Sequence, residues 1–405
     1  MPPPAEDAAP NFLDISPEDA QPEGYGENAA ENVRLAQETY RDLFIRLGET
    51  DWPRNPVGPL AFPWRTATGQ SATYLINIAF AMNRFSRNIT SKSGELFNAK
   101  LASLLRPTND QQFEETLTEF QVGATLSEHF SPISMEPLVP KELHFASDKP
   151  RSPDYGLKLP ETVVGVEVTV WHWERLVRWE RMVGEISRTI HKRVTTAGAL
   201  RDIRAAIPLT ADNATRNLMS SPAVCQMIID VDGDTLKFDV GADRPATLSW
   251  QPFLHFENEA SVDWDLIQST GARAWSVGPN AIQQFAFAWN PELTENDIDN
   301  AVASLRRSID HKRRQSTDEI PFLVAVGLHT GRVDWNTMSP LVTERLWQNP
   351  AYHWLSGLIE YTPARHAPLP YGQGELNLNF NPHADKLIPE SMIRAAVDGH
   401  QFHWP

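Results

Sequence analysis

Two acidic residues stand out because one of them lies in apolar surroundings. Glu167 lies in the run VVGVEVTVW, and Asp154 follows Pro153 thirteen positions before Glu167. A carboxylate in an apolar strand loses much of its solvation free energy unless it is paired or bound to a metal ion. The pattern therefore indicates either a divalent-metal site or an ordinary hairpin with one solvated face.

The two acidic residues are predicted to lie on neighbouring strands. PDYGLKL and VVGVEVTVW are typical of strands, and a turn centred near residues 161 and 162 would pair them antiparallel. Since side chains alternate between the faces of a strand, Asp154 and Glu167 then become diagonal neighbours on one face. Carboxylates that converge in this way repel each other unless a cation lies between them, and Mg²⁺ prefers such oxygen ligands.

A helix and further strands are expected around this hairpin. DQQFEETLTEFQVGATLSEHF carries apolar residues at helical spacing, and ISMEPLVP after it is typical of a short strand. Further on, CQMIIDVDGDTLKFDV is predicted to be a hairpin with an Asp-Gly turn. ENDIDNAVASLRRSIDHKRRQ then predicts a helix, and PFLVAVGL predicts a buried strand. The resulting order is one helix, three strands, a helix and a strand, with a long insertion before the second helix.

This order resembles the PD-(D/E)XK nuclease superfamily, in which a Pro-Asp strand precedes a strand with an acidic residue two positions before the motif lysine. The resemblance covers roughly residues 110–171 and 296–328. It implies an α/β fold with a restriction-endonuclease-like αβββαβ core, a mixed sheet, an N-terminal helical region and a long insertion.

Four regions are expected along the chain. Residues 1–28 are rich in Pro, Glu, Asp and Ala and are predicted to form a disordered acidic tail. Residues 29–108 form the helical region, and residues 109–335 form the nuclease-like core with an insertion at about 198–290. Residues 336–405 add C-terminal strands and a helix that complete the core.

The resemblance implies a site for Mg²⁺ or Mn²⁺ on the paired strands. Asp154 and Glu167 would be metal ligands, and the carbonyl of Val168 would be a third. The preceding helix is expected to supply an acidic residue that positions a ligand water. Glu119 is the expected residue there, with Glu115 one turn earlier as the alternative.

Thr169 occupies the position of the motif lysine. Its hydroxyl can hold a metal-bound water, but it supplies no positive charge. Lys158 shares a strand face with Asp154 but lies roughly 13 Å further along the strand. Lys312 or Gln315, from the later helix, are the expected substitutes.

Two basic clusters are candidates for contacts with phosphate groups. The first lies on a helix that follows the second acidic strand and consists of Arg175, Arg178, Arg181, Arg188 and Lys192. The second lies in the later helix and consists of Arg306, Arg307, Lys312, Arg313 and Arg314. Solvated helix faces that neutralise the many acidic residues are an equally good interpretation of both clusters.

Composition limits the class of protein. Of the 405 residues, 41% are hydrophobic and 22% are charged, and no apolar run is long enough to span a bilayer, so a cytoplasmic protein without a membrane partner is expected. The single cysteine, Cys225, excludes an internal disulfide. The net charge of -16 argues mildly against a nucleic-acid binder, although half of it comes from residues 1–31, which hold eight acidic and no basic residues.

The sequence thus predicts a divalent-metal-dependent phosphodiesterase, an endonuclease or exonuclease, that acts on nucleic acid, with DNA favoured over RNA. The superfamily resemblance suggests bacterial defence as a setting. An alternative is a catalytically inactive protein of nuclease fold that serves as a binding or scaffolding module, which Thr169 and the acidic charge support. A structural α/β protein whose hairpin only mimics the motif is a third interpretation, and a homo-oligomer stays open.

Overall fold

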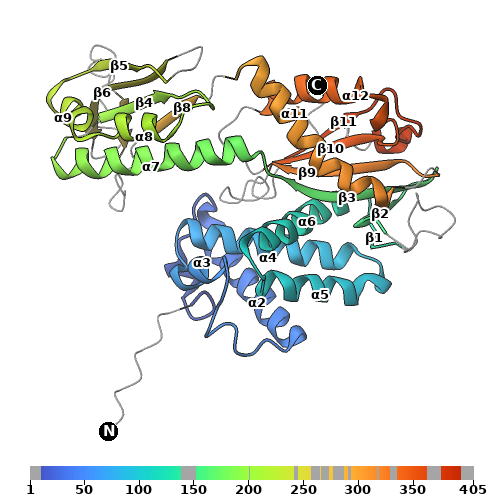
Figure 1. Cartoon of the computed structure of the whole chain (residues 1–405). Helices are drawn as coiled ribbons and strands as arrows, with labels where there is room; N and C mark the ends of the chain where they lie inside the picture. The colour runs from blue at the N-terminus through green and yellow to red at the C-terminus, as the bar shows by residue number, and fades with distance from the viewer. Residues whose placement is uncertain are drawn as a thin grey trace, which may run out of the picture. The chain divides into compact units, whose positions relative to one another are not determined.

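The computed structural model in Figure 1 consists of α-helices and β-strands that divide into two units. The first unit contains residues 1–171, 304–329 and 343–405, and the second contains residues 172–303 and 330–342. The structure describes residues 11–137, 152–199, 201–240, 245–256, 265, 273–276, 287–290, 293–316, 319–328, 335–362 and 375–393.

The first unit begins with helices whose apolar residues recur every three or four positions, so each helix has one face for the core. In α2, for example, Val33, Ala36, Tyr40 and Leu43 are buried. The helical elements are α1 (Pro17–Ala20), η1 (Gly26–Asn28), α2 (Ala29–Leu47), α3 (Ala61–Thr66), α4 (Gln70–Asn88), η2 (Ser91–Ser93), α5 (Gly94–Leu105) and α6 (Asp110–His129).

Residues 11–28 are folded, so the prediction of a disordered tail over 1–28 is wrong for this part. Phe12 is fully buried, and its ring lies 5.8 Å from that of Trp64. The N–H of Phe12 also donates to the Trp64 carbonyl at 3.0 Å. Trp64 belongs to an aromatic cluster with Tyr40 and Phe44. Packing on this cluster buries apolar surface and stabilises the segment, although its composition is acidic. Residues 1–10 lie outside the described residues.

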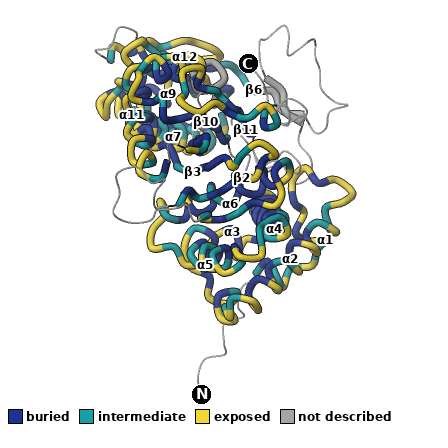
Figure 2. The backbone as a smooth tube through the Cα atoms, turned by 90° about the vertical axis from the view of Figure 1, so that its right-hand side faces the viewer, coloured by how far each residue is buried: buried dark blue, intermediate teal, exposed yellow. Residues whose placement is uncertain are grey.

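A mixed six-stranded sheet forms the rest of the first unit, in the order β1-β2-β3-β9-β10-β11. β3 pairs parallel with β9, which pairs parallel with β10, and the other pairs are antiparallel. Figure 2 shows the nearly continuous burial of β3, which is typical of an interior strand covered on both faces. The prediction of a mixed α/β protein is confirmed. The strands are β1 (Ile133–Met135), β2 (Tyr155–Lys158), β3 (Val163–Trp171), β9 (Phe322–Leu328), β10 (Gly357–Thr362) and β11 (Glu375–Phe380).

The hairpin of β2 and β3 differs in register from the prediction by two residues. Its turn is residues 160–161, and the N–H of Leu159 donates to the carbonyl of Thr162 across it at 2.9 Å. Continued one step beyond the paired residues, this register places Asp154 directly opposite Glu167 and not diagonal to it. A shift of two residues keeps every side chain on its face, so the two carboxylates still share one.

Helices cover both faces of β3. α6 packs against β3 on the side of Val166, which belongs to the same hydrophobic cluster as the α6 residue Phe120. On the other side, the indole N–H of Trp171 donates to Ser304 Oγ at 3.2 Å. Ser304 lies in α11 (Glu295–Asp310). Because Trp171 and Glu167 are four residues apart and share a face, α11 covers the face that carries Glu167.

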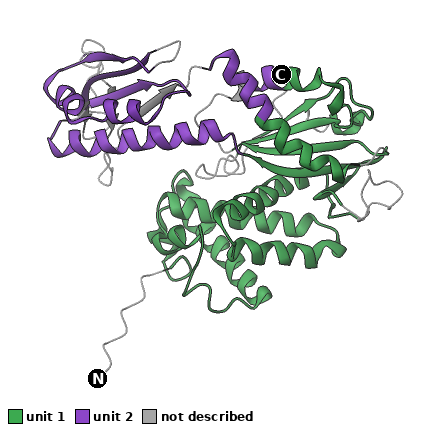
Figure 3. Ribbon diagram, in the orientation of Figure 1, with its two compact units in different colours: residues 1–171, 304–329, 343–405 green, residues 172–303, 330–342 purple. Residues whose placement is uncertain are grey.

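The second unit, purple in Figure 3, contains a sheet of order β5-β6-β4-β8, with β7 paired to β6. It begins at residue 172, so the long basic helix α7 belongs to it, whereas the prediction started the insertion at about 198. Its elements before α11 are α7 (Glu174–Thr196), β4 (Arg201–Ala206), α8 (Asn213–Met219), α9 (Pro222–Asp230), β5 (Asp234–Phe238), β6 (Ala246–Phe256), β7 (Arg273–Ser276) and β8 (Phe287–Asn290).

The hairpin predicted for residues 225–240 is wrong, because residues 222–230 form α9. The Ser221 hydroxyl caps this helix by accepting from the N–H of Val224 at 3.3 Å, and Pro222 fits the first turn, where no N–H is needed. The Asp-Gly turn is present at residues 232–233, but β5 after it pairs with β6.

Three further helical elements lie between α11 and β10. η5 (His311–Gln315) links α11 to β9, and α12 (Trp335–Trp347) and η6 (Pro350–Tyr352) precede β10. None of the helices in the described ranges combines the length and apolar character that crossing a bilayer requires.

We expect Gly357→Ala to destabilise the protein by about 1–3 kcal/mol, because the added Cβ would clash with backbone atoms that cannot move aside as a side chain can. A Cβ on Gly357 would lie 2.6 Å from the backbone oxygen of Asn379. Gly184→Ala, in α7, is the control, because a Cβ there meets nothing within 4 Å. Removing a helical glycine should stabilise by roughly 0.5–1 kcal/mol. Denaturant unfolding measures both effects, and a Gly357→Ala variant as stable as wild type would contradict this packing.

Candidate functional site

Glu167 is a buried carboxylate in the middle of β3, with 2% of its side chain exposed. Its Oε1 accepts a hydrogen bond from Lys312 Nζ at 2.7 Å, and its Oε2 accepts one from the N–H of Asp154 at 3.1 Å. Both oxygens therefore have partners, which offsets part of the loss of hydration.

Asp154 makes the reciprocal contact. Its Oδ2 accepts from the N–H of Val168 at 2.8 Å, so each carboxylate binds backbone next to the other. The N–H and C=O of a strand residue point to the same edge. The carbonyl of Val168 therefore points toward the Asp154 side of β3 and away from β9.

Lys100 is a site residue that the sequence analysis missed. It comes from α5 and forms a salt bridge with Glu119, and its Nζ lies 3.4 Å from Asp154 Oδ1 and 3.9 Å from Glu136 Oε1. Burial lowers the pKa of Lys100, but these carboxylates outweigh it and leave the pKa raised. The available signal was a single cation within the apolar run LFNAKLASLL.

Glu119, on α6, lies beside Lys100 in the same group of charged side chains. Burial, followed by the negative charge of Asp154, raises its pKa to about 7, although Lys100 opposes both effects. The Tyr155 hydroxyl donates to the backbone carbonyl of Glu119 at 2.7 Å and fixes α6 against β2. Glu115 is exposed and accepts a hydrogen bond from Gln111 at 2.9 Å, which places it outside the cluster.

Burial also dominates the pKa of Glu167 and, with the charge of Asp154, raises it to about 8. Lys312 opposes this shift. Burial lowers the pKa of Lys312, but its ion pair with Glu167 outweighs that effect and leaves the pKa raised. Lys312 therefore carries its positive charge at neutral pH.

The structure brings Lys312 to the acidic residues, from η5 and not from α11 itself. Gln315 lies three residues later, on the same side of this 3-10 turn, and its Oε1 is buried without a hydrogen-bond partner among the described residues. Thr169 follows Glu167 on the same face of β3 and is half-buried, whereas Lys158 is exposed at the end of β2.

The predicted phosphate-binding arginines fall into both units. In the second unit, Arg175 is paired with the buried Asp297 at 2.7 Å, Arg178 lies 3.6 Å from Glu174, and Arg181 is exposed. In the first unit, Arg313 and Arg314 are exposed on η5, next to Lys312.

The donor set suits a hard divalent cation. Asp154 and Glu167 supply carboxylate oxygens, each with lone pairs beyond those that the observed contacts use, and Val168 adds a carbonyl on the same side. The orphaned Oε1 of Gln315 is a further acceptor on the side of Lys312. Within the described residues, no three His, Cys, Asp or Glu side chains are close enough to hold a metal ion by themselves, so a cation here would also need carbonyl or water ligands.

No protein-family model matches the chain, and no curated protein and no solved structure matches it. The interpretation of this cluster of Lys100, Glu119, Asp154, Glu167 and Lys312, here called the acidic cluster, therefore depends on its own geometry.

We expect metal-free protein to lose stability as the pH rises from about 4.5 to about 8, and the loss should level off above that. The pKa values of Glu119 and Glu167 are raised from 4.5 to about 7 and about 8, so folding favours their protonated forms. That stability is fully present below pH 4.5 and is lost as the pH rises from 4.5 through each folded pKa, at up to about 1.4 kcal/mol per pH unit for each proton, because the unfolded carboxyl is ionised over this range while the folded one still holds its proton. Thermal unfolding in EDTA from pH 5.5 to 9 measures it.

Glu167→Gln mimics the protonated carboxyl and should show a flatter dependence of stability on pH. The matched control is Glu115→Gln on the exposed face of α6, which should follow wild type. Equal pH dependence for Glu167→Gln and wild type would show that Glu167 does not gain a proton on folding.

Proposed function

We propose that this protein is a divalent-metal-dependent phosphodiesterase that cleaves nucleic acid, with a site of PD-(D/E)XK type. The observation that carries the proposal is the reciprocal bonding of Asp154 and Glu167, each of which accepts a hydrogen bond from backbone next to the other. This places two acidic side chains together in a partly desolvated site, where their mutual repulsion favours a cation.

The topology of the first unit supports the fold part of the proposal. α6, β1, β2, β3, α11 and β9 follow one another in the order of an αβββαβ core, apart from the inserted second unit. β1, β2 and β3 pair antiparallel, and β3 pairs parallel with β9, as a helical crossover requires. We therefore infer a restriction-endonuclease-like core.

Each residue of the acidic cluster has a role in this proposal. Asp154, Glu167 and the Val168 carbonyl would hold Mg²⁺ or Mn²⁺, which supplies Lewis-acid stabilisation and an activated water when bound. Glu119 would orient a water at the same site. Lys312 keeps its charge at neutral pH, so it acts as an electrostatic partner for phosphate and not as a proton acceptor.

Thr169 and Gln315 complete the proposed site. The Thr169 hydroxyl shares the face of Glu167 and can hold a water, and the buried Oε1 of Gln315 can accept from one. The exposed Arg313 and Arg314, adjacent to Lys312, are placed to contact phosphates of the substrate, for which we favour DNA.

A catalytically inactive protein of the same fold is the second candidate. The observation that favours it is the presence of Lys100 and Lys312 at the carboxylates, because two ammonium groups already neutralise much of the charge that would attract a metal ion. Such a site would keep the fold and serve in binding or scaffolding.

Cleavage assays separate the two candidates. We expect wild type to cleave plasmid or single-stranded oligonucleotide with Mg²⁺ or Mn²⁺, and Asp154→Asn and Glu167→Gln to lose at least about 100-fold of that activity, the scale of removing one group that stabilises the transition state. Glu115→Gln, on the helix that carries Glu119, should retain wild-type activity.

Equal activity in Asp154→Asn, Glu167→Gln and wild type would refute the assignment of the site. If wild type binds Mn²⁺ but cleaves neither substrate, the inactive candidate replaces the nuclease. Circular dichroism of each variant confirms that a loss of activity is not a loss of fold.

A further inference from the structure

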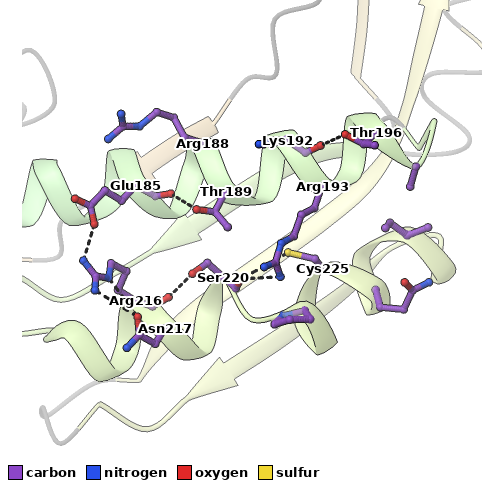
Figure 4. Close-up of a pocket in the computed structure, with 14 residues that line it drawn as sticks. Glu185, Arg188, Thr189, Lys192, Arg193, Thr196, Arg216, Asn217, Ser220 and Cys225 are labelled. Atoms are coloured by element: carbon purple, nitrogen blue, oxygen red, sulfur yellow. Dashed lines mark hydrogen bonds and ion pairs between the residues drawn. The ribbon is translucent and has the colours of Figure 1, made fainter.

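A basic groove lies within the second unit, and none of the residues of the acidic cluster line it. α7 forms one wall, and the end of α8 together with one face of α9 forms the other (Figure 4). Its volume is about 1170 Å³, larger than most pockets that enclose a small ligand, which are roughly 300–1000 Å³.

Four cationic side chains and one acidic side chain line the groove, so these charged groups sum to +3. They are Arg188, Lys192, Arg193, Arg216 and Glu185. The threonine and serine hydroxyls of the lining donate to carbonyls of their own helices, so among the uncharged side chains only the amide N–H groups of Asn217 and Gln226 are left to donate to phosphate oxygens. The groove therefore favours an anionic ligand with several acceptor oxygens.

Two of the cations hold the walls together. Arg216 Nη1 lies 2.6 Å from Glu185 Oε2, and Arg193 Nη1 lies 3.5 Å from the carbonyl of Ser220. Figure 4 shows Arg216 extending from α8 toward α7, and Arg193 extending from α7 toward the turn before α9. These contacts fix the groove in its observed form.

Arg188 and Lys192 lie exposed on the rim and have no ion-pair partner among the described residues. Arg188 uses only its Nε, which donates to its own helix at the Gly184 carbonyl at 3.2 Å. Four residues separate the two cations, which is roughly 6 Å along the helix axis. Phosphates recur every 3.4 Å or so along the axis of one strand of a duplex, so the pair can contact phosphates of adjacent or nearby nucleotides.

The cysteine that lines the groove, Cys225, is not an activated thiolate. Burial raises the pKa of its thiol despite the opposing charge of Arg193. Cys225 is therefore a neutral, buried side chain at neutral pH.

We propose that this groove of the second unit binds the sugar-phosphate backbone of nucleic acid through Arg188 and Lys192. The choice of nucleic acid rests on the nuclease function proposed for the first unit, whereas the preference for a chain of phosphates rests on the groove itself. The long inserted unit would then hold substrate, and the acidic cluster would cleave it.

Binding in EDTA tests the groove without cleavage. We expect full-length wild type to bind a fluorescent 30-nucleotide DNA in an anisotropy titration, and the double variant Arg188→Ala/Lys192→Ala to bind at least about tenfold more weakly at 50 mM KCl. Its slope of log affinity against log salt should fall by about 2, because two phosphate contacts are lost. Lys237→Ala, an exposed cation on β5 outside the groove, is the control and should bind like wild type.

The two proposals fail in different ways. The proposal for the groove is overturned if Arg188→Ala/Lys192→Ala keeps the affinity and salt slope of wild type, or if wild type does not bind DNA. If polyglutamate competes for the groove as well as unlabelled DNA does, nucleic acid is not its specific ligand. The same conclusion follows if the protein binds inorganic phosphate but does not bind DNA. If Glu167→Gln binds DNA like wild type and only the groove variant fails to bind, the groove stands even where no cleavage occurs.

Discussion

The first unit depends on one constraint, the burial of the Glu167 carboxylate inside a six-stranded sheet. Its 2% exposure removes nearly all hydration, so every oxygen needs a partner within the protein. The N–H of Asp154 supplies one partner and Lys312 supplies the other. Because those partners come from the chain before β2 and from the turn before β9, the carboxylate joins segments that lie far apart in the sequence.

The burial of the Glu167 carboxylate also accounts for the position of Lys100 beside the other carboxylates. Burial, and then the charge of Asp154 opposite it, raises the pKa of Glu167, and the two carboxylates carry more negative charge when ionised than Lys312 alone can balance. Lys100 approaches from α5 and contacts both Glu119 and Asp154. Three carboxylates and two ammonium groups thus remain with one net negative charge when all are ionised. A single bound proton balances this charge, as the raised pKa values of Glu119 and Glu167 indicate, whereas the proposed divalent cation would take its place through the remaining lone pairs of the carboxylates.

Strand periodicity in the sequence predicted the shared face of Asp154 and Glu167, because alternation depends on position alone. The register was wrong by two residues, since one turn at residues 160–161 fixes it and several turns fit the same pattern. Lys312 was among the expected substitutes for the motif lysine. The only sequence signal of Lys100 was its position within an apolar run, and its partners could not be predicted, because they lie on other elements that only the packing of α5 on α6 brings near.

Two further predictions failed, one because a distant contact outweighed local composition and one because a local helix start was overlooked. The acidic residues after residue 10 suggested disorder, but Phe12 packs on Trp64, more than 50 positions later. The Asp-Gly turn suggested a hairpin, but the Ser221 cap and Pro222 begin a helix just before it. The aromatic partner of Phe12 lies outside any local window, whereas the cap of α9 stands in the sequence just before the predicted hairpin, and β5 then pairs with the next strand, β6.

The most direct test of the acidic cluster as a cation site is a titration of metal-free protein with Mn²⁺ at pH 7.5, followed by the electron paramagnetic resonance signal of free Mn²⁺. We expect wild type and Glu115→Gln to bind Mn²⁺ alike. Glu167→Gln should bind it more than about tenfold more weakly, because it loses a carboxylate ligand. Wild-type protein that leaves millimolar Mn²⁺ free, or Glu167→Gln that binds it as tightly as wild type, would contradict a metal site at Asp154 and Glu167.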